Sequence, residues 1–119
     1  MSKLIFVSLQ VRNLEVSKEF YTEKLEFEIG EANPQACIFK YSKGEASFAI
    51  RTPLEDMEGK ELGMGVSVWF EVNERIDELK ERFIANGIAA ASPTMETPFG
   101  RAFHVKDPDG YKLTFLETR

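Results

Sequence analysis

The stretch FGRAFHVKDPDGYKLTF, residues 99–115, places a four-residue turn between two strand-like runs. Asp107 can accept hydrogen bonds from the turn backbone, and the proline after it presets φ at the second turn position. Gly110 suits the left-handed conformation that leads into the next strand. The flanking runs predict strands over Arg101–Lys106 and Tyr111–Glu117. The stretch therefore predicts a β-hairpin and, taken alone, indicates no chemistry.

The beginning of the chain shows an alternating run followed by a helical pattern. In residues Leu4–Val11, apolar side chains alternate with Phe6, Ser8 and Gln10, and a period of two predicts a strand with these two sets on opposite faces. Asn13 is a suitable N-cap, and apolar residues at helical spacing predict a helix over Leu14–Leu25. Three further strands are predicted near residues 27–29, 36–41 and 45–52.

The second half repeats this order of elements. A strand over Val66–Val72 precedes a helix over Glu74–Asn86 with Gly87 as its C′ residue, and three strands follow near residues 88–91, 101–106 and 111–117. With a shift of 61 positions, residues 9–11 fall on residues 70–72. We therefore predict an α+β fold of two tandem β-α-β-β-β modules that form a curled mixed sheet around a cleft. The single domain spans 1–119, with module 1 at about 1–53, a linker at about 54–65 and module 2 at about 66–119.

Composition narrows the function classes. The formal net charge is −5 and the 15 Lys and Arg residues are scattered, so no basic face for nucleic acid is expected. Cys37 is the one cysteine, which excludes an intrachain disulfide framework. No apolar stretch has the length of a signal peptide or membrane span, so we expect no membrane partner and a cytoplasmic location.

Several segments together resemble the vicinal oxygen chelate superfamily of glyoxalases, bleomycin-resistance proteins and extradiol dioxygenases. Residues 99–115 are similar to the end of that family's fold, residues 9–27 to its first strand-helix opening, and residues 68–72 to its second opening strand. Glu26 departs from the pattern, because the family usually has glycine at this helix exit. The resemblance implies two half-cups that make one cleft, and a homodimer, since chains of this family often share the cleft between subunits.

The resemblance also implies where a metal would bind. The four ligand positions of metal-dependent members fall on Phe6, near Ala49, on Ser67 and on Thr114. A phenyl ring and a methyl group have no lone pair to donate, and neutral hydroxyls are poor ligands compared with imidazole or carboxylate. We therefore expect no metal ion and no other cofactor.

The expected cleft face is aromatic and aliphatic with a few polar groups, which suits an organic molecule with flat or apolar parts. Trp69 is the best candidate for stacking on a ligand, and the alternative is that it is a core tryptophan. Phe6 and Phe99 are candidates for ligand contact, and the alternative for each is a packing role. Ala102 and Leu116 share this face. The ligand-binding candidates are Phe6, Ser8, Gln10, Ala49, Ser67, Trp69, Phe99, His104 and Thr114.

Two functions remain open. The first is metal-free sequestration of a small organic molecule, as in bleomycin-resistance proteins. The alternative is a glyoxalase-like lyase or dioxygenase of the same superfamily, or a metal-free isomerase that uses His104, the weak catalytic candidate, as acid and base. A structural role is the alternative for His104, and no nucleophile has an adjacent base. Arg51 and Arg101 are candidates to anchor an anionic ligand, with exposed charges as the alternative.

Overall fold

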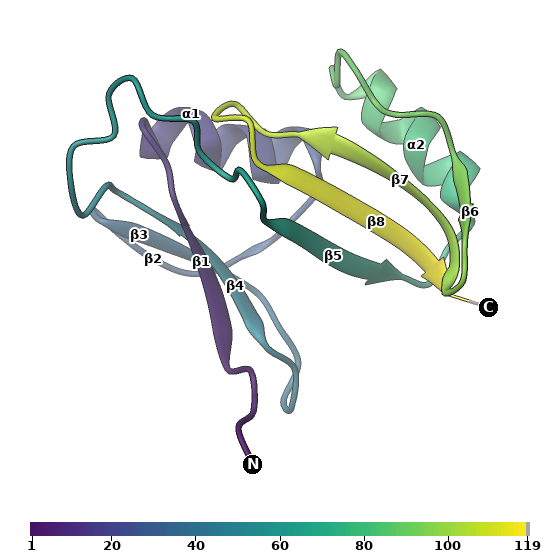
Figure 1. Cartoon of the computed structure of the whole chain (residues 1–119), viewed down its shortest axis with the longest axis horizontal. Helices are drawn as coiled ribbons and strands as arrows, with labels where there is room; N and C mark the ends of the chain where they lie inside the picture. The colour runs from purple at the N-terminus through teal and green to yellow at the C-terminus, as the bar shows by residue number, and fades with distance from the viewer. Residues whose placement is uncertain (119) are drawn as a thin grey trace. The chain divides into compact units, whose positions relative to one another are not determined.

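The computed structural model describes residues 1–118, and Arg119, the last residue of the expected domain, lies outside this part. The chain divides into two compact units, Met1–Lys60 and a second that begins at Glu61, which we call module 1 and module 2. Each contains one mixed four-stranded sheet and few helical residues (Figure 1). The predicted α+β fold of two tandem β-α-β-β-β modules is confirmed. No helix in residues 1–118 is long and apolar enough to cross a membrane.

Module 1 has the strand order β1-β4-β3-β2, with β1 parallel to β4 and the other pairs antiparallel. Asn13 caps the first helix as predicted, because its side chain accepts a hydrogen bond from the Val16 N–H. The elements are β1 (Phe6–Gln10), α1 (Leu14–Glu19), the π-helical turn η1 (Phe20–Lys24), β2 (Ile29–Asn33), β3 (Ala36–Phe39) and β4 (Ser47–Arg51).

Module 2 repeats this topology in the order β5-β8-β7-β6, again with the first and last strands parallel. The duplication inferred from a three-residue match therefore extends to every strand pairing. The elements are β5 (Ser67–Val72), α2 (Ile76–Ala85), β6 (Met95–Thr97), β7 (Gly100–Lys106) and β8 (Lys112–Thr118).

Aromatic side chains join each helical segment to one face of its own sheet. In module 1 the buried ring of Tyr21 lies with its centroid 5.5 Å from those of Phe39 and Phe48. In module 2 the buried ring of Phe83 lies 5.0 Å from Phe115 and 5.9 Å from Phe103. Edge and tilted contacts of this kind stabilise a core beyond the area they bury. Each sheet therefore has one covered face, which we call its helix face, and one other, its open face.

The predicted turn forms as the sequence indicates. Asp107 is buried, and its Oδ1 accepts hydrogen bonds from the backbone N–H groups of Asp109 and Tyr111, both at 2.9 Å. Gly110 has φ +93 and its N–H donates to the Asp107 carbonyl at 3.0 Å. The turn fixes the β7–β8 register, and with it the row of side chains across the open face of module 2.

The exits of the two helical segments match, although their residues differ. Glu26 has φ +66 and Gly87 has φ +107, and these two positions are related by the same 61-residue shift. A left-handed conformation costs an L-residue about 1–2 kcal/mol, whereas glycine adopts it freely. The departure at Glu26 therefore changes the cost of the exit and not its geometry.

One predicted strand is wrong. Residues 88–91 form no strand, and the edge strand of module 2 is Met95–Thr97 instead. Ile88 is buried at the end of α2, where its N–H donates to the Phe83 carbonyl, so it completes the helix exit. The Ser92 N–H donates to the His104 carbonyl of β7 at 2.9 Å, but Pro93 has no N–H for a sheet ladder, and the continuous β6–β7 pairing begins at Met95.

Candidate functional site

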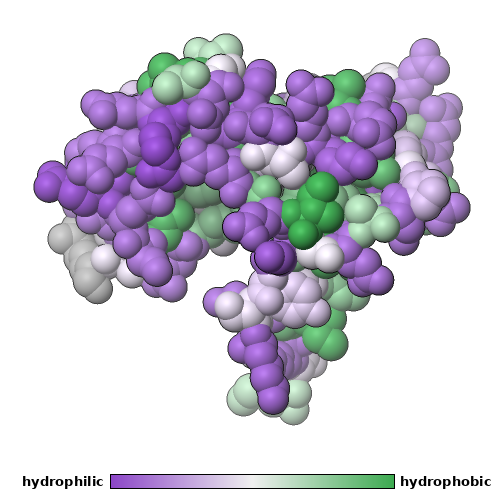
Figure 2. Space-filling model, turned by 180° about the vertical axis from the view of Figure 1, so that it is seen from behind, coloured by the Kyte–Doolittle hydropathy of each residue, from purple (hydrophilic) through white to green (hydrophobic). Residues whose placement is uncertain are grey.

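On each strand, every second side chain points to the open face of the sheet, and the others point to the helix face. Along β1, Leu9 is buried whereas Phe6, on the opposite face, is 58% exposed. The same alternation follows β5, where Trp69 is 45% exposed. In Figure 2 hydrophobic surface is visible among hydrophilic residues at the lower end of module 1, where the chain begins. The alternation predicted for β1 and β5 is confirmed, so the open faces present aromatic side chains to solvent.

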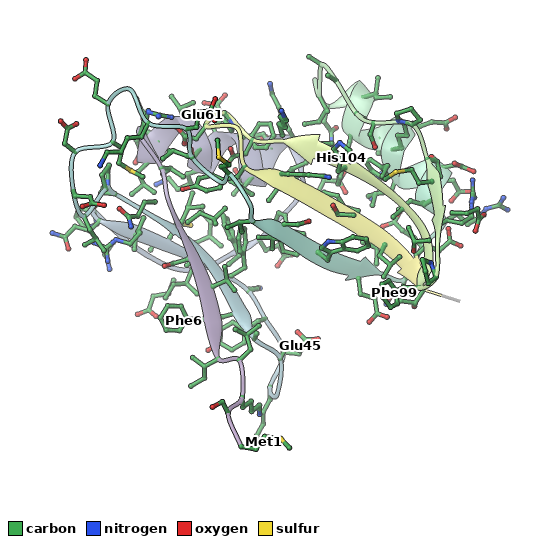
Figure 3. The ribbon with its side chains drawn as sticks, in the orientation of Figure 1. Met1, Phe6, Glu45, Glu61, Phe99 and His104 are labelled. Atoms are coloured by element: carbon green, nitrogen blue, oxygen red, sulfur yellow. The ribbon has the colours of Figure 1, made fainter. Side chains whose placement is uncertain are left out.

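The open face of module 1 contains a hollow of about 210 Å³, which we call the β1–β3–β4 hollow. Its floor consists of short side chains, and larger ones border it, including Phe6, which projects from β1 in Figure 3. Strand pairing accounts for the grouping, because Ser8 lies opposite Ala49 and Ala49 opposite Ile38. The lining residues are Phe6, Ser8, Ala36, Ile38, Ser47, Ala49 and Arg51.

Four of these seven residues, Ala36, Ile38, Ser47 and Arg51, were not among the predicted ligand-binding residues, although Arg51 was considered as an anion anchor. Burial alternates along β3 in the structure, but its sequence, ACIF, is apolar throughout and contains no signal that separates Ala36 and Ile38 from their neighbours. Gln10, a predicted member, shares the open face because it pairs with Arg51. Its side chain accepts a hydrogen bond from the Leu54 N–H at 2.9 Å instead of lining the hollow.

The open face of module 2 places Trp69, Thr114 and His104 in one row, on adjacent strands β5, β8 and β7. The indole N–H of Trp69 donates to Ser67 Oγ at 2.8 Å, which fixes the ring while the residue stays 45% exposed. Phe99, in the loop before β7, lies edge-on to this ring with the centroids 6.4 Å apart (Figure 3). Five of the predicted residues thus meet on this face.

The surroundings of His104 disfavour the charged form of its imidazole. Burial is the main cause that lowers the pKa of its imidazole, and Lys112 and Lys106 lower it further. The Nδ1 atom is buried and has no hydrogen-bond partner among residues 1–118. A lowered pKa favours the neutral imidazole, which is a weak base, and makes its protonated form unfavourable in the folded protein.

The lowered pKa of His104 predicts a specific pH dependence of stability. The unfolded chain has the higher histidine pKa, so it binds the proton first as the pH falls below about 6.5. The free energy of unfolding should therefore decrease from pH 7.5 to 5.5 and should decrease less in His104→Gln. Urea unfolding at several pH values measures both slopes. The prediction is wrong if the two slopes agree, since the chain contains no other histidine.

Arg101 does not lie free to anchor an anion. Its guanidinium pairs with Asp77 of α2 at 3.1 Å and with Glu96 at 3.5 Å. The hydrogen bond and charge of Arg101 lower the pKa of the Asp77 carboxyl. Arg51 is the other arginine considered from the sequence, and its guanidinium has no carboxylate partner among the described residues.

A family model described as the Glyoxalase/Bleomycin resistance protein/Dioxygenase superfamily matches residues 3–115. The chain belongs to this superfamily. The match spans both modules and agrees with the strand topology of each. No curated protein matches the sequence at a significant level.

Solved structures with the superfamily fold are similar over nearly the whole chain. An antibiotic binding protein from Streptomyces sp. CB03234 has a TM-score of 0.79 and 18% identity, covering 100% of this chain and 98% of that one. Lactoylglutathione lyase from Agrobacterium tumefaciens has a TM-score of 0.76 and 22% identity, covering 98% of this chain and 94% of that one. The bleomycin-binding protein from Streptomyces verticillus, complexed with copper(II)-bleomycin, has a TM-score of 0.73 and 22% identity, covering 100% of each chain. At these identities the likeness concerns the fold alone.

The residues that the sequence resemblance assigns to metal-ligand positions do not suit a metal ion. Phe6 and Ala49 offer no donor atom, and Ser67 Oγ already accepts the Trp69 N–H. The Thr114 side chain is a neutral hydroxyl on a residue that is 1% exposed. Within residues 1–118 no group of three or more His, Cys, Asp or Glu side chains could hold a metal ion.

Proposed function

We propose that this chain is a cytoplasmic binding protein that sequesters a small organic molecule without a metal ion. The observation that carries the proposal is the exposed indole of Trp69, on an open sheet face with Phe99 at its edge. Its N–H is already bonded to Ser67, so the exposed part of the aromatic ring, and not this donor, is what Trp69 offers a ligand. A flat aromatic group stacked there gains buried area and a favourable ring geometry.

Two further observations support binding over other roles. The β1–β3–β4 hollow gives module 1 an apolar recess on its own open face. Two of the solved structures with this fold are named for binding an antibiotic or bleomycin. A concave, mostly apolar surface with a few polar groups is the usual form of a small-molecule site.

The proposal includes a homodimer whose subunits together complete the binding site. Leu4 and Ile5 support it, because these apolar side chains at the start of the chain are 65% and 70% exposed. Exposed apolar groups near a strand end are typical of surfaces that associate.

The direct test is a fluorescence titration, because Trp69 is the only tryptophan in the chain. We expect saturable quenching by members of a panel of planar aromatic compounds that includes metal-free bleomycin, with no effect of a chelator. Trp69→Ala should weaken binding, measured by calorimetry, by about tenfold or more. Tyr41→Ala removes a more exposed ring, 58% against 45%, from the segment between β3 and β4 and should leave binding unchanged.

Sedimentation of the same samples should give twice the 13.6 kDa chain mass. Elemental analysis should find no stoichiometric metal. The proposed function is wrong if no compound quenches saturably, or if Trp69→Ala binds as tightly as the natural protein. A monomer would remove the dimer from the proposal, and stoichiometric metal would favour an enzyme.

His104 favours one alternative function, a metal-free enzyme that moves a proton. The pKa of its imidazole is lowered, mainly by burial, so the neutral base is present at pH 7. His104 lies in the same row as Trp69, with Thr114 between them. Loss of turnover in His104→Gln with unchanged ligand affinity would support this alternative.

A further inference from the structure

Arg51 differs from the other residues that line the β1–β3–β4 hollow, because it alone is charged. It lies at the end of β4, between Gln10 on β1 and Ala36 on β3. Its Nε donates to the neighbouring Thr52 carbonyl at 3.1 Å, and its remaining donors have no partner among the described residues. The residue is half-buried, so its charge is only partly screened by water.

Some other cations of the chain are paired with carboxylates. Lys18, Lys40, Arg82 and Arg101 each have a carboxylate within ion-pair distance. An unpaired, half-buried guanidinium beside an apolar recess leaves hydrogen-bonding capacity unused in the free protein. A planar guanidinium fork matches a carboxylate, which it can bind through two parallel hydrogen bonds.

The duplicated fold provides an internal comparison. The register that pairs Ala49 with Ser8 in module 1 pairs Thr114 with Trp69 in module 2, so Arg51 corresponds to Leu116. The fold therefore does not require a cation at this position. The strand topology alone therefore does not explain why Arg51 stands here, and its guanidinium is available to a ligand.

The shape of the hollow limits the ligand. Its volume of about 210 Å³ lies below the range of about 300–1,000 Å³ that is typical for drug-sized ligands, which indicates one or two rings. Ala36, Ala49 and Ser8 give a floor of short side chains, and Phe6 and Ile38 offer apolar contact above it. A flat ring can lie on such a floor with an acidic group directed at Arg51.

We propose that the β1–β3–β4 hollow binds a small planar aromatic carboxylate, with its ring against Phe6 and Ile38 and its carboxylate on Arg51. The proposal rests on the proposed binding function and names the ligand class for module 1. The chain's net charge of −5 opposes the approach of any anion, so the attraction must be local to Arg51. Binding should for that reason depend only weakly on ionic strength.

The test compares 2-naphthoate with the neutral amide of the same shape, 2-naphthamide, by calorimetry on the full chain. We expect the natural protein to bind the naphthoate about 10- to 100-fold more tightly than the amide, since a hydrogen bond to a charged group contributes that much. Arg51→Gln should abolish this preference, and Arg51→Lys should retain part of it. Phe6→Ala, a change at an exposed side chain, should weaken binding of both compounds.

Lys40→Gln is the matched control, because it removes one positive charge from the same module at an exposed residue outside the hollow. It should leave the preference unchanged. The proposal is overturned if naphthoate and naphthamide bind equally, or if Lys40→Gln removes the preference as fully as Arg51→Gln does. It is also overturned if Phe6→Ala binds both compounds as tightly as the natural protein does. In each of these cases, quenching of Trp69 by other compounds would leave the proposed function standing.

Discussion

Gly100→Ala is expected to lower the free energy of unfolding by about 2–6 kcal/mol, a large share of the 5–15 kcal/mol of a typical domain. Gly100 has φ +144, a conformation that L-residues rarely adopt. A Cβ built on it would lie 2.1 Å from the Glu117 carbonyl oxygen, which belongs to the neighbouring strand β8. Neither atom belongs to a flexible side chain, so the two strands must separate.

Gly44→Ala is the matched control for this prediction. Gly44 also has a positive φ, +91, but an added Cβ meets nothing within 4 Å. This substitution should cost only the backbone strain, about 1 kcal/mol. Urea unfolding followed by circular dichroism measures both variants. Equal losses in the two would show that the contact with Glu117 does not limit position 100.

Gly100→Ala should also disturb the aromatic pair of module 2. Thr97 Oγ1 accepts hydrogen bonds from the N–H groups of Phe99 and Gly100, both at 3.1 Å, and donates to the Gly100 carbonyl at 2.7 Å. This tight turn sets the position of Phe99 beside Trp69. Displacing β7 from β8 displaces the turn, so stability and ligand affinity should fall together.

Sequence predicted those features that depend on local geometry. The alternation of residues 4–11 assigned Phe6, Ser8 and Gln10 to the open face, because side chains of a strand alternate strictly. The turn at Asp107 was equally predictable, since its residue types suit only a few backbone conformations. The order of elements was predictable for both modules, because an alternating run followed by a helical pattern occurs in each half of the sequence.

Features that depend on several strands were less accessible. The β1–β3–β4 hollow needs the register of three strands, which the sequence does not give, and its floor residues Ala36 and Ser47 are individually unremarkable. The π-helical turn over Phe20–Lys24 also escaped prediction, because its apolar spacing is close to that of an α-helix. The strand predicted at residues 88–91 does not form, because Ile88 is buried at the helix end and bonds to the Phe83 carbonyl there.

Phe83→Ala is expected to destabilise the protein by about 3–5 kcal/mol, the usual cost of deleting a buried phenyl ring. Phe83 is 1% exposed and touches two rings on the helix face of its sheet, Phe103 and Phe115. Because the Phe103 and Phe115 rings are themselves stacked at 5.8 Å, they cannot easily move into the space that the substitution leaves. The cavity should therefore remain, and the cost should lie at the upper end of this range.

Phe83→Leu separates the loss of the ring from the loss of volume. It keeps an apolar side chain of similar size and should cost about 1.5 kcal/mol or less, as volume-conserving changes in a core usually do. Urea unfolding followed by Trp69 fluorescence is a suitable measurement, because Trp69 lies on the opposite face of the same sheet and reports on module 2. A loss below about 1 kcal/mol in Phe83→Ala would contradict the packing of α2 against this sheet. If Phe83→Ala lowers stability while the fully folded fraction still binds ligand with the natural affinity, the helix face supports the fold and the open face carries the binding site.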